Sequence, residues 1–257
     1  MRSGSAPHTV TDGFTLTKPA MDPAPTGIVR GMKHTLLATL VLAGLAGGVA
    51  MTASDDAAKA TQAAPAAEWT ALFNGKDTTG WTAFVPDLKG KDQMSVWSVA
   101  DGCLKCAGNP IGYIRTTEKY ENFELELEWR FDPKKGAGNS GVLLRTIGED
   151  MVWPNSMEAQ LHSENAGDIW NIGDFPMKAA ADRTNGRHTR KEHATNEKPL
   201  GEWNRYRILV DGGRLELWVN GLLQNVATDC KVVPGWIALQ SEGAFIEFRN
   251  IRLKKLR

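Results

Sequence analysis

The chain has no excess of charge of either sign, because its 257 residues include 30 Lys and Arg against 30 Asp and Glu. A protein that binds nucleic acid through its phosphates needs a positive surplus, so this balance argues against a general nucleic-acid binder. Charged residues make up 23% of the sequence and hydrophobic residues 42%, which argues against wholesale disorder. The length suits one large β-rich domain or two smaller domains.

Long apolar runs are also scarce. The one strong run, LLATLVLAGLAGGVA at 36–50, spans about 15 residues, whereas a membrane-spanning helix needs roughly 20. Met32-Lys33-His34 places a basic leader before this run, and small residues follow it as far as Ala60. This layout is typical of a secretory signal peptide. It predicts export to the periplasm or the extracellular space and no membrane contact after cleavage; the alternative is an anchor that is not removed.

The same pattern divides the chain into four parts. Residues 1–31 have no periodic apolar pattern, and we interpret them as an extension upstream of the true start at Met32. Residues 32–60 form the predicted signal peptide and 61–68 a linker. Residues 69–257 hold all nine tryptophans and form the predicted folded domain.

Cysteine is rare, with only Cys103, Cys106 and Cys230. The Cys103-Leu-Lys-Cys106 spacing is that of zinc knuckles and thioredoxin motifs, but no second CxxC accompanies it. The segment follows Asp101-Gly102 and is predicted to be a hairpin strand, on which positions i and i+3 face opposite sides. That disfavours both a shared metal and a mutual disulfide, and leaves open a bridge from Cys230 to either partner.

The sequence lacks the common catalytic signatures. It has no Gly-x-Ser-x-Gly elbow, no phosphate-binding glycine loop, no His-Glu-x-x-His and no dinucleotide fingerprint. The histidines of the predicted domain, His162, His188 and His193, are too scattered for a metal site to be identified from spacing. The sequence therefore requires no cofactor, although clustered carboxylates permit a divalent metal.

What the sequence has in abundance is a period of two. Phe123, Leu125, Leu127, Trp129 and Phe131 alternate with polar residues, and similar patterns cover 142–145, 157–161, 206–210, 215–219, 237–239 and 245–253. Asp-Gly and Asn-Gly pairs at 101–102, 211–212 and 220–221 favour tight hairpins between such strands. Many short strands with turn signals between them predict an all-β fold, an antiparallel sandwich or jelly roll.

One polar and basic stretch, 178–200, breaks this rhythm. We expect a long loop, or a short helix with a loop, over one end or face of the sandwich. Long irregular segments in compact domains are often functional, and a solvated surface insertion is the alternative.

The residues opposite the core positions include groups suited to acid–base chemistry and to hydroxyl recognition. If their strands are neighbours, they converge on one sheet face. The alternative is a sheet face that is polar because it faces water. The set comprises Glu124, Glu126, Glu128, Arg145, Glu158, Gln160, His162, Gln240 and Glu242.

The tryptophans divide by their position. Trp153 and Trp170 lie in or near predicted loops, where an exposed indole could stack on a sugar ring. Trp97, Trp129 and Trp218 lie in strand patterns and are predicted to pack in the core. Trp81 and Trp203 fit either environment.

Ten motifs in order along 69–251 resemble the 3-keto-disaccharide hydrolase domain family. They are specific jointly rather than singly. They include Trp69-Thr-Ala-Leu-Phe-Asn-Gly-Lys-Asp77, Asn139-Ser-Gly-Val-Leu-Leu-Arg145, Met157-Glu-Ala-Gln160 and Ile237-Ala-Leu-Gln-Ser-Glu-Gly243, with the others at 80–81, 97–102, 120–130, 201–204, 219–221 and 248–251.

The resemblance implies a concanavalin A-like jelly roll that acts on a carbohydrate oxidised at its 3-position. The ketone acidifies the C2 proton, so a base can start elimination of the glycosidic oxygen, and water then adds; direct hydrolysis by a carboxylate pair is the competing mechanism. The implied roles are Glu158 as base or metal ligand, Arg145 as oxyanion stabiliser and His162 as acid. The residues implied to hold the sugar are Asn139, Gln160, Asp168, Trp170, Gln240 and Glu242.

Two other classes of function stay open at this point. Jelly rolls also serve as non-catalytic carbohydrate-binding modules, which need a groove with stacking tryptophans but no close acid–base pair. A surface interaction protein would instead have the candidate residues dispersed around the sandwich.

Overall fold

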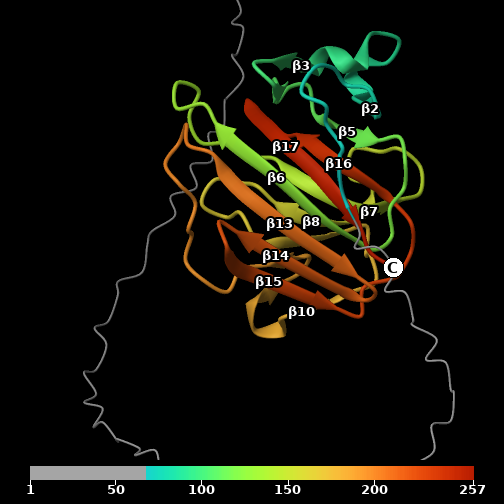
Figure 1. The fold of residues 1–257 in the computed structure, drawn as a ribbon. Coiled ribbons are helices and arrows are strands. Elements are labelled where there is room, and N and C mark those ends of the chain that lie inside the picture. The colour runs from blue at the N-terminus through green and yellow to red at the C-terminus, as the bar shows by residue number, and fades with distance from the viewer. Residues whose placement is uncertain (1–67) are drawn as a thin grey trace, which may run out of the picture. The chain divides into compact units, whose positions relative to one another are not determined.

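The computed structural model describes residues 68–257 (Figure 1). The predicted extension at 1–31, the signal peptide at 32–60 and all of the linker except Glu68 lie outside the described residues. Within 68–257, no helix is long and apolar enough to cross a membrane.

The first of two antiparallel β-sheets has nine strands. In Figure 1, its strands β17, β6, β13, β14 and β15 lie side by side across the front of the molecule. In order across the sheet the strands are β10 (Lys178–Ala179), β15 (Leu222–Thr228), β14 (Arg214–Val219), β13 (Asn204–Asp211), β6 (Phe123–Phe131), β17 (Ile246–Lys255), β4 (Cys103–Cys106) and β3 (Trp97–Ala100), with β1 (Trp69–Ala71) paired to β17.

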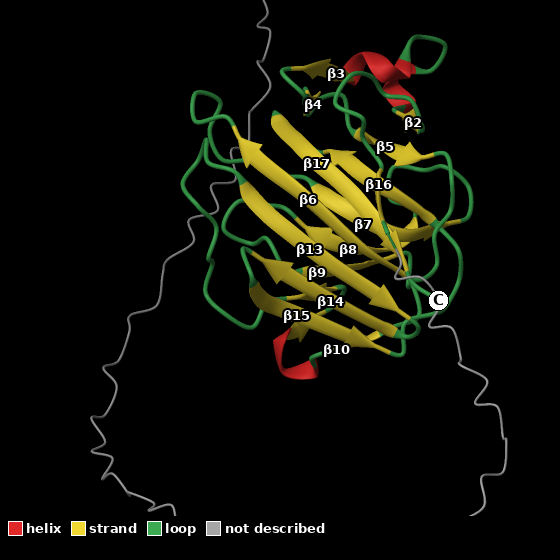
Figure 2. Cartoon of the chain, viewed as in Figure 1, coloured by secondary structure: helices red, strands yellow, loops and turns green. Residues whose placement is uncertain are grey.

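The second sheet has eight strands and packs behind the first. Helical structure in the described residues is confined to three short 3-10 turns, η1 (Pro86–Leu88), η2 (Gln93–Val96) and η3 (Ala181–Arg183) (Figure 2). The strands of this sheet, in order, are β11 (Thr184–Asn185), β12 (His188–Thr189), β9 (Ile169–Ile172), β8 (Asn155–Gln160), β7 (Gly141–Ile147), β16 (Trp236–Ser241), β5 (Gly112–Thr116) and β2 (Trp81–Phe84).

The core lies between the two sheets and follows from the alternation. On β6, Phe123, Leu125, Leu127, Trp129 and Phe131 are all buried in it, while the glutamates between them point outward. Because side chains alternate across a strand, each sheet turns one apolar set inward. The predicted all-β antiparallel sandwich is confirmed.

Two of the predicted hairpin turns each contain two consecutive residues of positive φ. Asp101 (φ 56°) and Gly102 (72°) join β3 to β4, and Asn220 (47°) and Gly221 (85°) join β14 to β15. Asn, Asp and Gly tolerate this left-handed conformation better than other residues. The hairpin predicted for the CxxC segment is therefore confirmed, and all three cysteines are buried and unpaired.

Two sequence interpretations were wrong in detail. Trp218 is only half-buried on the outer face of the nine-stranded sheet, because Leu215, Leu217 and Val219 occupy the inward positions of β14. Its indole N–H donates to Glu216 over 3.0 Å. The segment 178–200 is not free of strands, since it contains β10, β11 and β12.

Arg145 is fully buried and holds several connections of the chain together at one end of the sandwich. It is predicted from the alternation to share a face with Gly141 and Leu143, but the pairing of β7 with β8 shifts register between Leu144 and Ile147. Arg145 itself has a positive φ of 48°, so the bulge turns its side chain away from that face.

The guanidinium of Arg145 is fully occupied by the protein. It donates to the backbone oxygens of Glu121 (2.9 Å), Lys231 (2.8 Å) and Gly212 (2.8 Å), and to Oδ1 of Asn122 (3.1 Å). These partners lie in three separate connections of the chain. Arg145 is thus unavailable to a substrate, and the structure does not support its implied role as an oxyanion stabiliser.

Replacing Arg145 by Lys should lower the free energy of unfolding by about 2–4 kcal/mol, because one ammonium cannot satisfy the buried carbonyl groups that the guanidinium fork reaches. Urea denaturation followed by fluorescence measures this change. The control is Arg249→Lys, on the outer face and paired with Glu128, for which a change below about 1 kcal/mol is expected. Equal effects of the two variants would contradict the role assigned to Arg145.

Candidate functional site

The described structure brings most of the predicted site residues together in a hollow on the outer face of the eight-stranded sheet. We call it the inner hollow, and its volume is about 190 Å³. Two strands, β8 and β9, and four connections between strands contribute to it. The lining residues are Asn139, Trp153, Glu158, Gln160, Trp170, Ile172, Arg187 and Glu242.

Glu158 lies at the floor of the inner hollow, near the middle of β8, and is 4% exposed. Its neighbours across the sheet are Leu143 on β7 and Trp170 on β9. Leu143 belongs to a small apolar cluster on this outer face, so the carboxyl group of Glu158 packs against apolar side chains rather than facing water. The period of two in the sequence is what directs Glu158 and Gln160 to the same side.

Gly141 is the residue that makes room for this carboxyl group. A Cβ at position 141 would overlap Oε1 of both Glu158 and Gln240, which come from the strands on either side of β7. Gly141 has no positive φ, so the glycine is required here by space and not by backbone conformation. The bare backbone lets side chains of β8 and β16 approach each other across an intervening strand.

Two carboxyl groups in the site have strongly raised pKa values. Burial, and then the charge of Glu242, raise the pKa of Glu158 to about 8, against smaller opposing effects of the Gln240 amide and Arg187. Burial raises the pKa of Glu242 to about 7. Neither carboxylate has an ion-pair partner among the described residues. Paired carboxyl groups perturbed in this way are typical of acid–base sites.

Several polar atoms around the inner hollow are buried without a hydrogen-bond partner. Those that line it are Oδ1 of Asn139 and Oε2 of Glu242, while the amide of Gln240 does not line the hollow and lies over Gly141 beside Glu158. Buried polar atoms of folded proteins nearly always have partners, so a group of orphans at one place points to a ligand that supplies them. Gln160 is different, because its Oε1 accepts from the backbone N–H groups of Leu161 and His162.

The walls of the inner hollow carry the two tryptophans predicted to contact sugar. Trp153 is 41% exposed, an unusual environment for an indole in a folded domain. Trp170 is half-buried and stacks on the imidazole of His188, with 4.4 Å between ring centroids and 10° between planes. One face of the Trp170 indole is thus taken by protein, which leaves the other face or the edge for a ligand.

Asp168 is placed behind this wall and does not line the inner hollow. Its Oδ2 lies 2.6 Å from Nε2 of His188, and its Oδ1 accepts from the backbone N–H of Lys191. The prediction that Asp168 contacts the sugar is therefore not supported. Oδ2 holds His188 against Trp170, and Oδ1 fixes the backbone at Lys191.

Two lining residues were not predicted from the sequence, the apolar Ile172 and the charged Arg187. Arg187 lies in the tight turn between β11 and β12, and its guanidinium is 5.8 Å from the centre of the Trp170 ring. The signal that could have located it is Gly186, whose positive φ of 58° suits the first central position of the two-residue turn Gly186-Arg187. The basic segment 178–200 therefore contributes directly to the site.

A second hollow adjoins the first, and we call it the outer hollow. Its volume is about 530 Å³, and it shares Asn139 and Glu242 with the inner hollow as a common wall. The exposed His162 lies here and not beside Glu158. The other residues that line it are Ala137, Gly138, Ser163, Glu164, Gly243 and Ala244.

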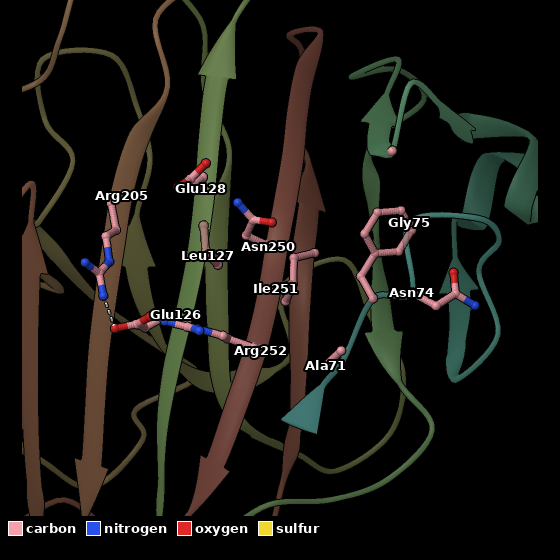
Figure 3. Close-up of a pocket in the computed structure, with 12 residues that line it drawn as sticks. Ala71, Asn74, Gly75, Glu126, Leu127, Glu128, Arg205, Asn250, Ile251 and Arg252 are labelled. Atoms are coloured by element: carbon pink, nitrogen blue, oxygen red, sulfur yellow. Dashed lines mark hydrogen bonds and ion pairs between the residues drawn. The ribbon is translucent and has the colours of Figure 1, made fainter. Parts of the chain in front are cut away.

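The remaining candidates, Glu124, Glu126 and Glu128, lie on the other sheet, so the prediction that they share a face with Glu158 was wrong. Glu126 and Glu128 line a separate cavity of about 570 Å³ over β6 and β17, and Glu124 lies on the same strand, β6. Figure 3 shows Glu126 held between Arg205 and Arg252. Burial alone would raise the pKa of Glu126, but the hydrogen bonds from these arginines bring it below the ordinary value. These are structural ion pairs.

The described residues contain no group of three or more His, Cys, Asp or Glu side chains positioned to hold a metal ion. Glu158 and Glu242 are the carboxylate donors that a divalent cation would find in the inner hollow. Carboxylate and amide oxygens suit a hard cation, so the donor chemistry fits such an ion.

Comparison with known proteins identifies relatives of this chain. The sequence profile of the 3-keto-alpha-glucoside-1,2-lyase-like domain family matches residues 68–254. The chain is 28% identical over 233 residues to a 3-keto-disaccharide hydrolase of Bacteroides thetaiotaomicron, an alignment that covers 72% of this chain and 77% of that protein.

Solved structures show the same architecture. A candidate glycosyl hydrolase of Parabacteroides distasonis is 25% identical, with a TM-score of 0.55 over 74% of this chain and 94% of that chain. A β-glucanase of Bacillus licheniformis is 12% identical, with a TM-score of 0.51 over 76% of this chain and 100% of that chain, and so shares the fold. The predicted jelly-roll class is confirmed.

The raised pKa of Glu158 makes stability depend on pH. Since the folded-state pKa exceeds that of the unfolded chain, the neutral carboxyl contributes stability that is fully present below about pH 4.5 and is lost as pH rises through about 8. Glu158→Gln lacks this loss. Relative to the wild type it should gain on the order of 2–4 kcal/mol in free energy of unfolding between pH 5 and pH 9.

Urea denaturation of both proteins at the two pH values provides the measurement. Glu128→Gln is the matched control, because Glu128 pairs with Arg249 on the other sheet. A pH-independent difference between Glu158→Gln and the wild type would show that Glu158 titrates normally.

Proposed function

The chain belongs to the 3-keto-alpha-glucoside-1,2-lyase-like domain family, and from this premise we propose that it is a glycoside-acting enzyme that cleaves 3-keto-glycosides. The observation that carries the proposal is the pair of the buried Glu158 and the half-buried Glu242, which has no ion-pair partner among the described residues and lies in a hollow walled by two tryptophans. A carbohydrate-binding module needs the tryptophans but has no use for such a carboxyl pair.

The inner hollow suits one oxidised sugar ring. Trp153 and Trp170 offer flat apolar surfaces, which bind the C–H faces of pyranose rings. The unpartnered oxygens of Asn139 and Glu242, which line the hollow, can accept hydrogen bonds from hydroxyl groups. Together they match a ligand that is apolar on its faces and polar around its rim.

Glu158 is the proposed base. Between the pKa values of the two carboxyl groups, about 7 and about 8, the pair holds close to one proton. That proton lies mainly on Glu158, whose pKa is the higher, so the reactive arrangement, with Glu158 ionised and Glu242 protonated, is the less populated of the two one-proton forms. A carboxylate in an apolar setting is a stronger base than one in water, which matters for removal of a proton from carbon.

In the proposed reaction, Glu158 takes the proton from C2, which the ketone at C3 has acidified. The electrons of the broken C2–H bond form a C1–C2 double bond, and the bond from C1 to the glycosidic oxygen breaks. Glu242 gives its proton to the departing oxygen. Water then adds across the double bond, with hydroxyl to C1 and a proton to C2, so the net reaction is hydrolysis.

Arg187 replaces Arg145 as the proposed stabiliser of negative charge. As C2 loses its proton, charge develops on the oxygen at C3, and a guanidinium on the wall of the hollow favours that charge. Arg187 lines the inner hollow, whereas Arg145 is bound to backbone carbonyls elsewhere. Glu158 and Glu242 are also the residues that would hold a divalent cation, and such an ion would supply Lewis-acid stabilisation of negative charge when bound.

Replacing Glu158 by Gln should lower kcat for a 3-keto-disaccharide by about 10²- to 10⁴-fold, because an amide cannot remove the C2 proton. Release of the free sugar, measured by chromatography, follows the reaction. Glu128→Gln again provides the control and should keep wild-type turnover. Full turnover by Glu158→Gln would remove this residue from the mechanism.

The unoxidised disaccharide separates this chemistry from direct hydrolysis. Without a ketone its C2 proton is not acidic, so the wild type should not cleave it. Equal cleavage of both sugars would refute the elimination, and binding of both without cleavage would favour a binding module.

We also propose that the protein is exported. The basic leader at Met32, the apolar run at 36–50 and the small residues up to Ala60 support this. The mass of the protein recovered from the periplasm or medium should correspond to a chain that begins near residue 61. Recovery of the full-length chain from the cytoplasm alone would argue against export.

A further inference from the structure

The outer hollow is not accounted for by the oxidised sugar in the inner hollow. We propose that it binds the leaving group, and that it selects a hydroxylated leaving group, such as a second sugar, over a flat aromatic one. This inference rests on the proposed function and adds the direction in which the substrate lies across the site.

The direction follows from how the two carboxyl groups are shared between the hollows. Glu158 lines only the inner hollow, whereas Glu242 lines both. C2 of the oxidised sugar must contact the base, so that sugar lies in the inner hollow. The glycosidic oxygen must contact the acid, so it lies at the wall where the hollows meet, and the leaving group extends into the outer hollow.

The boundary itself supports this placement. Asn139 and Glu242 form the shared wall, and each has a buried oxygen with no hydrogen-bond partner. A glycosidic oxygen and the hydroxyl groups next to it would lie between these two side chains. The orphan atoms are thus where a linkage between two sugar rings needs polar contacts.

The lining of the outer hollow indicates the chemical class of the leaving group. It contains no tryptophan, tyrosine or phenylalanine, in contrast to the inner hollow. Ala137, Gly138, Gly243 and Ala244 keep it open, while His162, Ser163 and Glu164 supply polar groups. A hydroxylated ring finds hydrogen bonds here, and an aromatic ring finds no stacking partner.

His162 is the side chain best placed to contact such a leaving group. Its Nδ1 lies 2.9 Å from both Asn165 Nδ2 and the backbone oxygen of Ser163, so Nδ1 is satisfied within the protein. Nε2 makes no hydrogen bond to the described residues and is left for a ligand. His162 thereby becomes a binding residue of the outer hollow, and the acid role implied by the resemblance passes to Glu242.

The test compares two substrates that differ only in the leaving group, a 3-keto-disaccharide and the methyl 3-keto-glucoside. The readout is the ratio of kcat/KM for the disaccharide to kcat/KM for the methyl glycoside. His162→Trp fills the outer hollow and should lower this ratio at least about tenfold, because a methyl group needs no room there. His162→Ala tests the hydrogen bond alone and should lower the ratio about three- to tenfold.

His193→Trp is the matched control, since it adds the same bulk at a position outside both hollows, and its ratio should equal that of the wild type. An unchanged ratio in both His162 variants would overturn the proposal, as would an equal loss with the two substrates, which is the result expected if His162 is the general acid. If the wild type cleaves neither substrate, the proposed function itself fails, and the two failures are therefore distinguishable.

Discussion

The burial of two carboxyl groups without a counter-ion is the constraint on which the site depends. The same sandwich shows the opposite solution on its other sheet, where Glu126 is held by Arg205 and Arg252 and its pKa falls. Glu158 packs against an apolar cluster and has a second carboxyl group beside it, so its pKa rises. Burial is common to Glu126 and Glu158, and the presence or absence of a paired cation decides the direction.

The scaffold supports this arrangement with residues that do not touch the hollow. Asp168 fixes His188, and His188 in turn supports one face of Trp170. Arg145 ties three connections together at one end of the sandwich, which steadies the strands that present the carboxyl groups. Rigid support of this kind is what a site needs when the geometry between a base and a carbon-bound proton must be held.

The period of two was enough to predict much of the fold and half of the site from the sequence. It located Leu127 in the core and placed Glu158 and Gln160 on one face. It could not reveal which sheet each strand joins, and so it grouped Glu126 with Glu158. It also failed at Arg145, because a β-bulge reverses the alternation and nothing in the local sequence marks the bulge. Arg187 was missed because the Gly186-Arg187 turn stands in a segment dominated by charge, where no strand pattern drew attention to it.

The pairing of β12 with β9 gives one hairpin two roles. The hairpin that supplies Arg187 and His188 also covers the open margin of the eight-stranded sheet, and it ends in β11, a strand of two residues. Uncovered sheet margins invite pairing with other chains, and very short strands blunt that tendency. A deletion of the hairpin that carries Arg187 would therefore also expose β9 as a sheet edge open to pairing with other chains. The protection of this sheet edge and the positive charge of the inner hollow thus both depend on one segment.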